Sequence, residues 1–114
     1  MITINISEQA LEYKGKSYSI STAKNGIGVV EDSYCTPTGK FKIAEKIGAN
    51  LELGAVLVDR ESTGEIYNAD LAKKNPDRDW ILTRILWLDG VEVHNRNTKN
   101  RYIYIHGSPE ETQM

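Results

Sequence analysis

The amino-acid sequence predicts a mainly-β domain with a minor helix, arranged as a β-sandwich or a partly closed barrel. Short runs rich in β-branched and aromatic residues recur along the chain and are separated by turn residues. Residues 68–75 carry the signals of the one minor helix. Residues 80–88 are apolar on both faces except at Thr83 and Arg84, which is typical of a central strand. The 114 residues suffice for one domain with a modest core.

The N-terminal third predicts short strands joined by tight turns. Ile2, Ile4 and Ile6 alternate with polar residues, which indicates a half-buried strand. Residues 10–13 and 17–22 flank a glycine turn, which indicates a hairpin. The loop that follows contains an Asn-Gly pair, and this pair favours positive φ.

Strand and helix signals follow one another through the middle of the chain. The turn at residues 36–39 precedes a strand at residues 40–44, and residues 55–58 form a short apolar strand. Residues 68–75 predict a short helix, which begins at an asparagine cap and ends before Pro76.

The C-terminal third predicts the central strand, a hairpin and a polar loop. The central strand occupies residues 80–88, and the Asp-Gly pair after it indicates a hairpin into residues 91–93. Residues 94–100 are almost entirely polar, so we expect a loop there before the last strand.

The last predicted strand, residues 101–106, carries a histidine at its end. Tyr102, Tyr104 and His106 share one strand face, so the tyrosines are expected to flank a cleft that ends at the histidine. Ser108 is a good helix N-cap, and the proline and glutamates after it suit the first turn of a helix.

Charge and composition exclude several classes of protein. The net charge is −2 and the pI is about 5.7, so nothing predicts binding to a nucleic-acid backbone. No apolar run is long enough to span a membrane, and residues 1–6 do not resemble an export signal. These features fit a cytosolic protein or a domain whose leader has been removed. The single cysteine, Cys35, excludes an internal disulfide and a cysteine zinc cluster.

His106 is the first candidate for chemistry. A histidine at a strand end can reach both solvent and substrate, which suits a general base; the alternative is an ordinary surface histidine. Cys35 and His106 together would make a nucleophile–base pair. We favour the other interpretation of Cys35, a small residue at a turn, because no helix N-terminus is present there to lower its thiol pKa.

The remaining polar clusters predict neither a metal site nor a cofactor site. His94 has no second histidine or carboxylate at metal-ligand spacing, so we interpret it as exposed and structural. Arg96, Lys99 and Arg101 suit an anionic ligand, but solvated loop charge is the simpler interpretation. Residues 36–39 lack the glycine spacing of a phosphate-binding loop.

Three segments that occur in order, and a fourth that lies between the last two of them, resemble one known family. Together they closely resemble the YkuD-type L,D-transpeptidase catalytic domain, and the fourth is similar to its Gram-negative branch. The segments are Ser21–Gly28, Thr36–Gly48, Tyr102–Ser108 and Asp79–Leu88. The resemblance covers nearly the whole chain and implies a mainly-β fold.

The resemblance also implies a reaction and a set of site residues. A cysteine of the family attacks the L,D peptide bond of a peptidoglycan tetrapeptide stem and releases D-alanine. The acyl group then passes to an amine, forming a 3→3 cross-link, or to water. His106 matches the general base, and Gly107 matches the residue whose carbonyl orients the imidazole. Substrate-binding positions are expected at Tyr102, Tyr104, Ser108 and Asn25.

The chain departs from the family at the nucleophile. It contains no Ser-His-Gly-Cys motif and ends at Met114, and Cys35 is not at the nucleophile position. We therefore expect residues 1–114 to be a C-terminally incomplete catalytic domain that lacks its cysteine segment and is inactive. β-Lactams such as carbapenems are expected partners only if that segment is present.

Three alternatives stay open at this stage. The parent protein is a transpeptidase or an L,D-carboxypeptidase; the chain is a non-catalytic module that binds peptidoglycan stem peptides; or another chain supplies the cysteine. No cofactor is expected. The family places the protein in the cell envelope or periplasm, while the lack of an export signal leaves the cytoplasm open.

Overall fold

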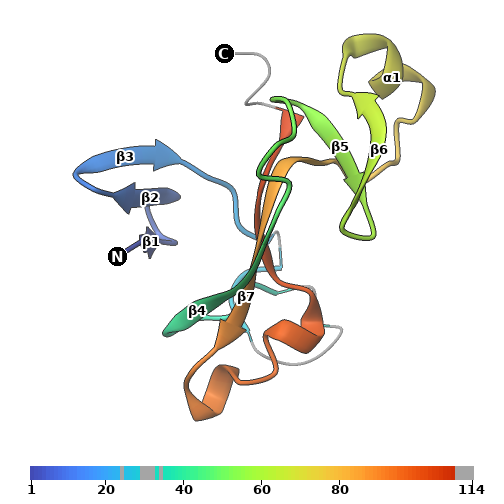
Figure 1. Ribbon diagram of the computed structural model, residues 1–114. Coiled ribbons are helices and arrows are strands. Elements are labelled where there is room, and N and C mark those ends of the chain that lie inside the picture. The colour runs from blue at the N-terminus through green and yellow to red at the C-terminus, as the bar shows by residue number, and fades with distance from the viewer. Residues whose placement is uncertain (24, 29–32, 34, 110–114) are drawn as a thin grey trace. The chain divides into compact units, whose positions relative to one another are not determined.

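The computed structural model describes residues 1–23, 25–28, 33 and 35–109 (Figure 1). The chain divides into two compact units, Met1–Thr38 and Gly39–Met114, and each is described by itself. The described residues form two sheets and one short α-helix, so the predicted mainly-β class with a minor helix is confirmed. Neither sheet closes into a barrel, which is compatible with the sandwich alternative.

The N-terminal unit contains a three-stranded antiparallel sheet. Its strands are β1 (Thr3–Asn5), β2 (Ala10–Tyr13) and β3 (Lys16–Ser19), in the order β1-β2-β3. Lys14 and Gly15 connect β2 to β3 with φ of 50° and 78°, as a tight hairpin turn requires, so the predicted hairpin is confirmed. The predicted half-burial of the first strand holds at Ile2 and Ile6, which are half-buried, and fails within β1. All of β1 is exposed, because it is a three-residue edge strand with one partner.

The C-terminal unit is built around one long strand, β7 (Ile81–Gly90). The sheet order is β4-β7-β5-β6, with β8 also paired to β7. Ile85 of β7 pairs with Ile47 on one side and His106 on the other, which confirms the predicted central strand. The other strands are β4 (Phe41–Ile47), β5 (Ala55–Val58), β6 (Glu61–Ile66) and β8 (Tyr104–Gly107).

The buried apolar core comes from two neighbouring strands. β5 contributes Ala55, Val56 and Leu57, and β7 contributes Leu82 and Ile85, all of them at most 2% exposed. Consecutive residues of β5 point to opposite faces, so this strand is buried on both faces of the sheet. β7 is paired on both edges, which suits its apolar sequence.

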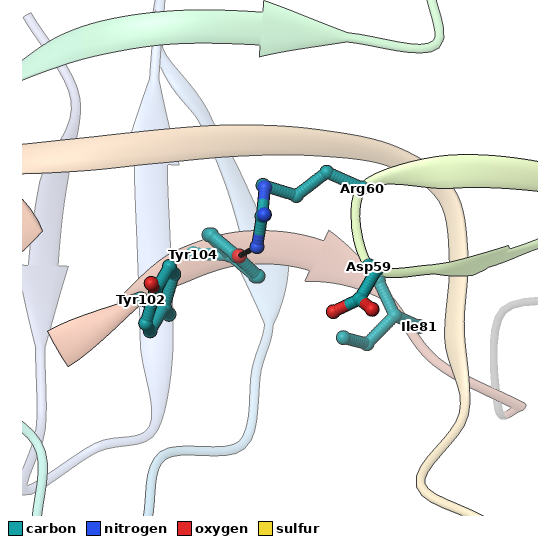
Figure 2. A pocket seen from close by; sticks show the side chains of 5 residues that line it. All are labelled: Asp59, Arg60, Ile81, Tyr102 and Tyr104. Atoms are coloured by element: carbon teal, nitrogen blue, oxygen red, sulfur yellow. Dashed lines mark hydrogen bonds between the residues drawn. The ribbon is translucent and has the colours of Figure 1, made fainter. Parts of the chain in front are cut away.

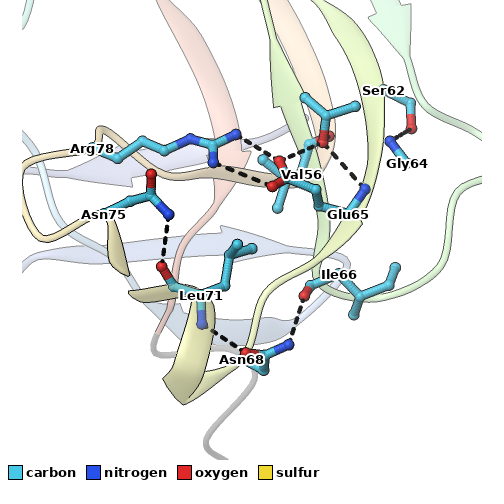
Figure 3. Close-up of polar contacts among 10 residues, drawn as sticks. Val56, Ser62, Gly64, Glu65, Ile66, Asn68, Leu71, Asn75 and Arg78 are labelled. Atoms are coloured by element: carbon cyan, nitrogen blue, oxygen red, sulfur yellow. Dashed lines mark hydrogen bonds and ion pairs between the residues drawn. The ribbon is translucent and has the colours of Figure 1, made fainter. Parts of the chain in front are cut away.

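The predicted helix is confirmed as α1 (Ala69–Lys74). The side chain of Asn68 caps it by accepting a hydrogen bond of 2.8 Å from the Leu71 amide. Figure 3 shows this cap beside an ion pair in which Arg78 Nη2 lies 2.7 Å from Glu65 Oε1. The ion pair ties the segment after α1 back to β6.

The predicted hairpin after the Asp-Gly pair is wrong. β7 continues through Gly90, and a 3₁₀ turn, Val93–Asn95, follows in place of a strand. The side chain of Asn95 is fully buried, accepts a hydrogen bond from the Glu92 amide and donates one to the Lys40 carbonyl. A Cβ at Gly90 would overlap the Asn95 carbonyl, so the glycine permits this close approach instead of a hairpin turn.

The last strand begins later than its sequence predicts. A second 3₁₀ turn, Lys99–Arg101, is followed by Tyr102 in the left-handed region (φ 57°), and β8 starts only at Tyr104. The strand β6 was not predicted, because its six residues include a glycine and only one large apolar side chain. Residues 110 and 111, which belong to the predicted helix start, lie outside the described residues.

Candidate functional site

His106 and Gly107 lie side by side at the end of β8. His106 is exposed, and its Nδ1 lies 2.7 Å from the Gly107 carbonyl oxygen. A carbonyl oxygen can only accept, so the contact is a hydrogen bond when Nδ1 carries the proton. The Nε2 lone pair is then the proton acceptor of the ring. The geometry thus selects one tautomer and leaves a basic nitrogen at Nε2.

A β-bulge in β7 lies opposite this histidine. Leu82 pairs with Gly107 and Ile85 pairs with His106, so two residues of β7 have no partner in β8. One of them, Thr83, has a φ of 71°, which confirms the local kink. Bulges of this kind redirect neighbouring side chains and are enriched beside active sites.

The loop before β5 holds the bulge in place. The Gly54 amide donates a 2.9 Å hydrogen bond to the Thr83 hydroxyl. The Arg84 guanidinium donates to the Leu51 carbonyl at 2.9 Å and to the Thr83 carbonyl at 3.1 Å. The bond to the Thr83 carbonyl gives a backbone group of the bulge a partner, and the other two bonds join the bulge to the loop.

A pocket of about 330 Å³ lies in the same unit (Figure 2). It is lined by residues from the β5–β6 turn, the start of β7 and the approach to β8, namely Asp59, Arg60, Ile81, Tyr102 and Tyr104. The structure therefore brings the two predicted tyrosines together in one cavity. His106 is not among the lining residues. The prediction that Tyr102 shares a strand face with Tyr104 and His106 is wrong, because Tyr102 has a left-handed backbone and lies before the start of β8.

The Arg60 guanidinium is the centre of an aromatic cluster. Its Nη1 donates to the Tyr104 hydroxyl at 3.3 Å, and its Cζ lies 5.1 Å from the ring centres of both Trp87 and Tyr102. Those two rings stack with centres 5.7 Å apart. The hydrogen bond to Tyr104 and the nearby Asp59 carboxylate raise the pKa of Arg60 above its ordinary value. Arg60 is therefore a permanent cation.

Three of the five pocket residues have left-handed backbones. Asp59 and Arg60 have φ of 50° and 66° and form the two-residue turn between β5 and β6. Tyr102 has a φ of 57°. Residues other than glycine are uncommon in this region, and such strained positions concentrate at functional sites.

The other candidate residues are not among the residues that line this pocket. Ser108 is half-buried directly after β8. Asn25 belongs to the N-terminal unit, where its side chain donates to the Ser33 carbonyl at 3.0 Å. The half-buried Cys35 thiol lies 3.4 Å from the Asn25 carbonyl oxygen. Lys24, which begins the predicted loop with the Asn-Gly pair (residues 24–28), lies outside the described residues.

Sequence reasoning missed Asp59, Arg60, Ile81 and Trp87 as site residues. The turn at residues 59 and 60 has no glycine or asparagine, so it carries no hairpin signal, and β6 was not predicted as its partner strand. Trp87 was interpreted only as part of an apolar strand. The one available signal was the apolar character of β7 on both faces.

His94 is exposed, as predicted. Within the described ranges, no three His, Cys, Asp or Glu side chains are grouped as metal ligands. No α-helix in the same part of the chain is long and apolar enough to cross a membrane.

Comparison with known proteins identifies one family. The YkuD family, described as the L,D-transpeptidase catalytic domain, matches residues 1–114. No curated protein and no solved structure gives a significant match. Because the family match spans the whole chain, the protein belongs to the YkuD family of L,D-transpeptidase catalytic domains.

Proposed function

We propose that this chain supplies the general base and part of the substrate site of a peptidoglycan L,D-transpeptidase. The observation that carries the proposal is the 2.7 Å contact between His106 Nδ1 and the Gly107 carbonyl. The carbonyl holds Nδ1 protonated, so Nε2 accepts the proton of a thiol. It also stabilises the imidazolium that forms, as the aspartate of a catalytic triad does.

The proposed reaction is the cysteine acyl transfer of the family. The thiolate attacks the carbonyl of the L,D peptide bond in a tetrapeptide stem, and the imidazolium of His106 protonates the departing amine of D-alanine. An amine of a neighbouring stem then takes the acyl group, or water takes it and gives L,D-carboxypeptidase activity. We propose Tyr102, Tyr104, Ser108 and Asn25 as substrate contacts and the cell envelope as the location.

The 114 residues contain no Ser-His-Gly-Cys, and their one thiol, Cys35, belongs to the N-terminal unit. We therefore propose that these residues alone form no acyl-enzyme. Incubation of the chain with a carbapenem should leave the intact mass unchanged, with the Cys35→Ser variant as the control. A covalent adduct that maps to Cys35 would contradict the assigned structural role of that thiol.

A second candidate function is a module that binds stem peptides without chemistry. The observation that favours it is the pocket, whose five lining residues all come from this chain. Both candidates predict peptide binding, and they differ in whether His106 serves as a base.

The tautomer of His106 tests the leading proposal. Long-range ¹⁵N NMR at a pH above the histidine titration should give a protonated Nδ1 and an unprotonated Nε2. The exposed His94 in the same spectrum is the internal reference. A His106 ring protonated at Nε2 instead would remove the base from the position that the mechanism needs.

A further inference from the structure

The pocket beside β8 contains one cation and one anion that do not pair with each other. Among the residues that the structure describes, the ion pairs join Lys42 with Asp89 and Arg78 with Glu65, so no salt bridge closes between Asp59 and Arg60. Asp59 is exposed and Arg60 is half-buried, and both line the pocket. Two opposite charges thus face one small cavity.

The turn geometry explains why the two side chains stay apart. Both residues have positive φ, and the Arg60 side chain lies against the rings of Trp87 and Tyr102 with its Nη1 on the Tyr104 hydroxyl. Figure 2 shows the Asp59 carboxylate beside Ile81, while the guanidinium points to Tyr104. The carboxylate therefore faces the cavity from one side and the guanidinium borders it from another.

The guanidinium retains donors for a ligand. Arg has five N–H groups in a planar fork, and the bond to Tyr104 uses one Nη. The neighbouring rings contact the guanidinium without accepting its in-plane hydrogen bonds. A ligand carboxylate is the group that matches such a fork best.

We propose that this pocket binds an α-amino-acid head group, in which an ammonium and a carboxylate sit on the same carbon. The ligand carboxylate pairs with Arg60 and its ammonium with Asp59. The aliphatic part lies against Ile81 and the two tyrosines. A volume of about 330 Å³ is at the small end of ligand sites and suits a group of this size.

A ligand with a single charge fits the pocket less well. Asp59 would repel a simple anion and Arg60 would repel a simple cation, whereas a zwitterion meets an opposite charge at both positions. The inference rests on the proposed function, because it names the chemical group of the substrate that Tyr102 and Tyr104 contact.

The direct test compares three matched ligands on the 114-residue chain by NMR titration. Norleucine, in both D and L forms, carries both charges; hexanoate lacks the ammonium; pentylamine lacks the carboxylate. Norleucine should bind saturably and shift the Tyr104 and Ile81 signals, with hexanoate and pentylamine weaker by about tenfold or more. Equal binding of hexanoate, or no saturable binding of norleucine at millimolar concentration, would overturn the proposal.

A second ligand tests whether the bound head group belongs to a free amino acid or to a peptide. A γ-glutamyl dipeptide carries the same ammonium and carboxylate at the end of a side chain that continues into a peptide. Tighter binding of the dipeptide than of norleucine assigns the pocket to a peptide-borne group. The reverse order assigns it to a free amino acid.

Variants separate recognition from folding. Asp59→Asn keeps a residue that tolerates positive φ and removes the charge, so norleucine binding should weaken about tenfold while hexanoate binding stays equal or improves. Loss of both would indicate structural damage instead and would contradict the assigned role of Asp59. Arg60→Gln should weaken norleucine and hexanoate alike. Lys99→Gln is the matched control, since Lys99 contacts the Trp87 ring but does not line the pocket.

The head-group site and the proposed function can be refuted independently of each other. A chain that binds tetrapeptide stems, but binds norleucine no better than hexanoate, refutes the head-group site and leaves the proposed function standing. A chain that binds norleucine through Asp59 and Arg60, but shows no binding of stems, refutes the proposed function alone.

Discussion

Single residues decide both the stability of the C-terminal unit and the chemistry at its edge. Asn95 and Thr98 are as completely buried as the apolar core, and Asn95 joins the Glu92 amide to the Lys40 carbonyl. Buried polar side chains stabilise a fold only when their hydrogen bonds are made. A single hydrogen bond is equally important at His106, because the Gly107 carbonyl holds the proton on Nδ1 and leaves Nε2 as the basic ring nitrogen.

The Asn95→Ala variant tests whether the hydrogen bonds of this buried side-chain amide stabilise the fold. It removes the partner of the Glu92 amide and one of two donors to the Lys40 carbonyl, which keeps its hydrogen bond from the Val91 amide. We therefore expect a loss of about 1–3 kcal/mol in the free energy of unfolding. Urea denaturation measures the change. The exposed Asn100→Ala is the control and should be nearly neutral. Equal midpoints for the two variants would mean that the buried amide contributes nothing.

At the scale of elements, the bulge in β7 links the core to the histidine. The bulge separates the pairs Leu82–Gly107 and Ile85–His106, and the amide of the buried Gly54 anchors it at Thr83. The strand end that carries His106 is thus positioned by a loop that precedes β5, more than fifty residues earlier in the chain. Its orientation should therefore respond to changes in the bulge.

Thr83→Val tests that link. The variant keeps the branched shape and removes the acceptor of the Gly54 amide, so we expect a loss of about 1–3 kcal/mol in stability and a change in the His106 ring signals. Thr3→Val on the exposed strand β1 is the control for loss of a threonine hydroxyl. A stability loss with an unchanged His106 spectrum would show that the bulge does not position the histidine.

The ion pair between β6 and the segment after α1 makes stability depend on pH. The Arg78 guanidinium, and then the Thr63 hydroxyl, hold the pKa of Glu65 below its ordinary value of 4.5. A carboxyl with a lowered folded-state pKa stabilises the fold above its unfolded-state pKa, and the contribution is lost as pH falls through the folded-state pKa.

Glu65→Gln should therefore lower Tm at neutral pH, and the gap to wild type should close in acid below about pH 4.5. Thermal melts at a series of pH values measure this gap. Glu61→Gln, on the same strand, leaves the Arg78 ion pair in place and serves as the control. A gap that is constant from neutral pH to pH 3 would rule out Glu65 ionisation as its cause.

At the scale of the whole molecule, the sequence predicts the elements that carry strong local signals. Ala55–Val58, the helix with its Asn68 cap and the central strand were all predicted from their own residues. The bulge depends on pairing with β8, which is distant in the chain, so no local pattern reports it. Strand β6 follows a two-residue turn without glycine or asparagine, and Tyr102 adopts a left-handed backbone although it is not glycine, so neither carries the usual local signal.

The candidate site divides in the same way. His106, Gly107, Tyr102 and Tyr104 were found from the last strand and the family resemblance. Arg60 was not found, because its place in the pocket comes from a turn between two strands and from contacts with rings more than twenty-five residues away. Local sequence identifies the residues of one strand, whereas a pocket is assembled by the sheet.

The central claim is that the unit carrying β8 binds a peptidoglycan stem peptide beside His106. The most direct measurement is an NMR titration of the 114-residue chain with a tetrapeptide stem, following the Tyr102, Tyr104 and His106 signals. The account predicts saturable shifts at the two tyrosines and at His106, and weaker binding by Arg60→Gln. No saturable shift at millimolar peptide, or shifts confined to residues far from these three, would contradict it.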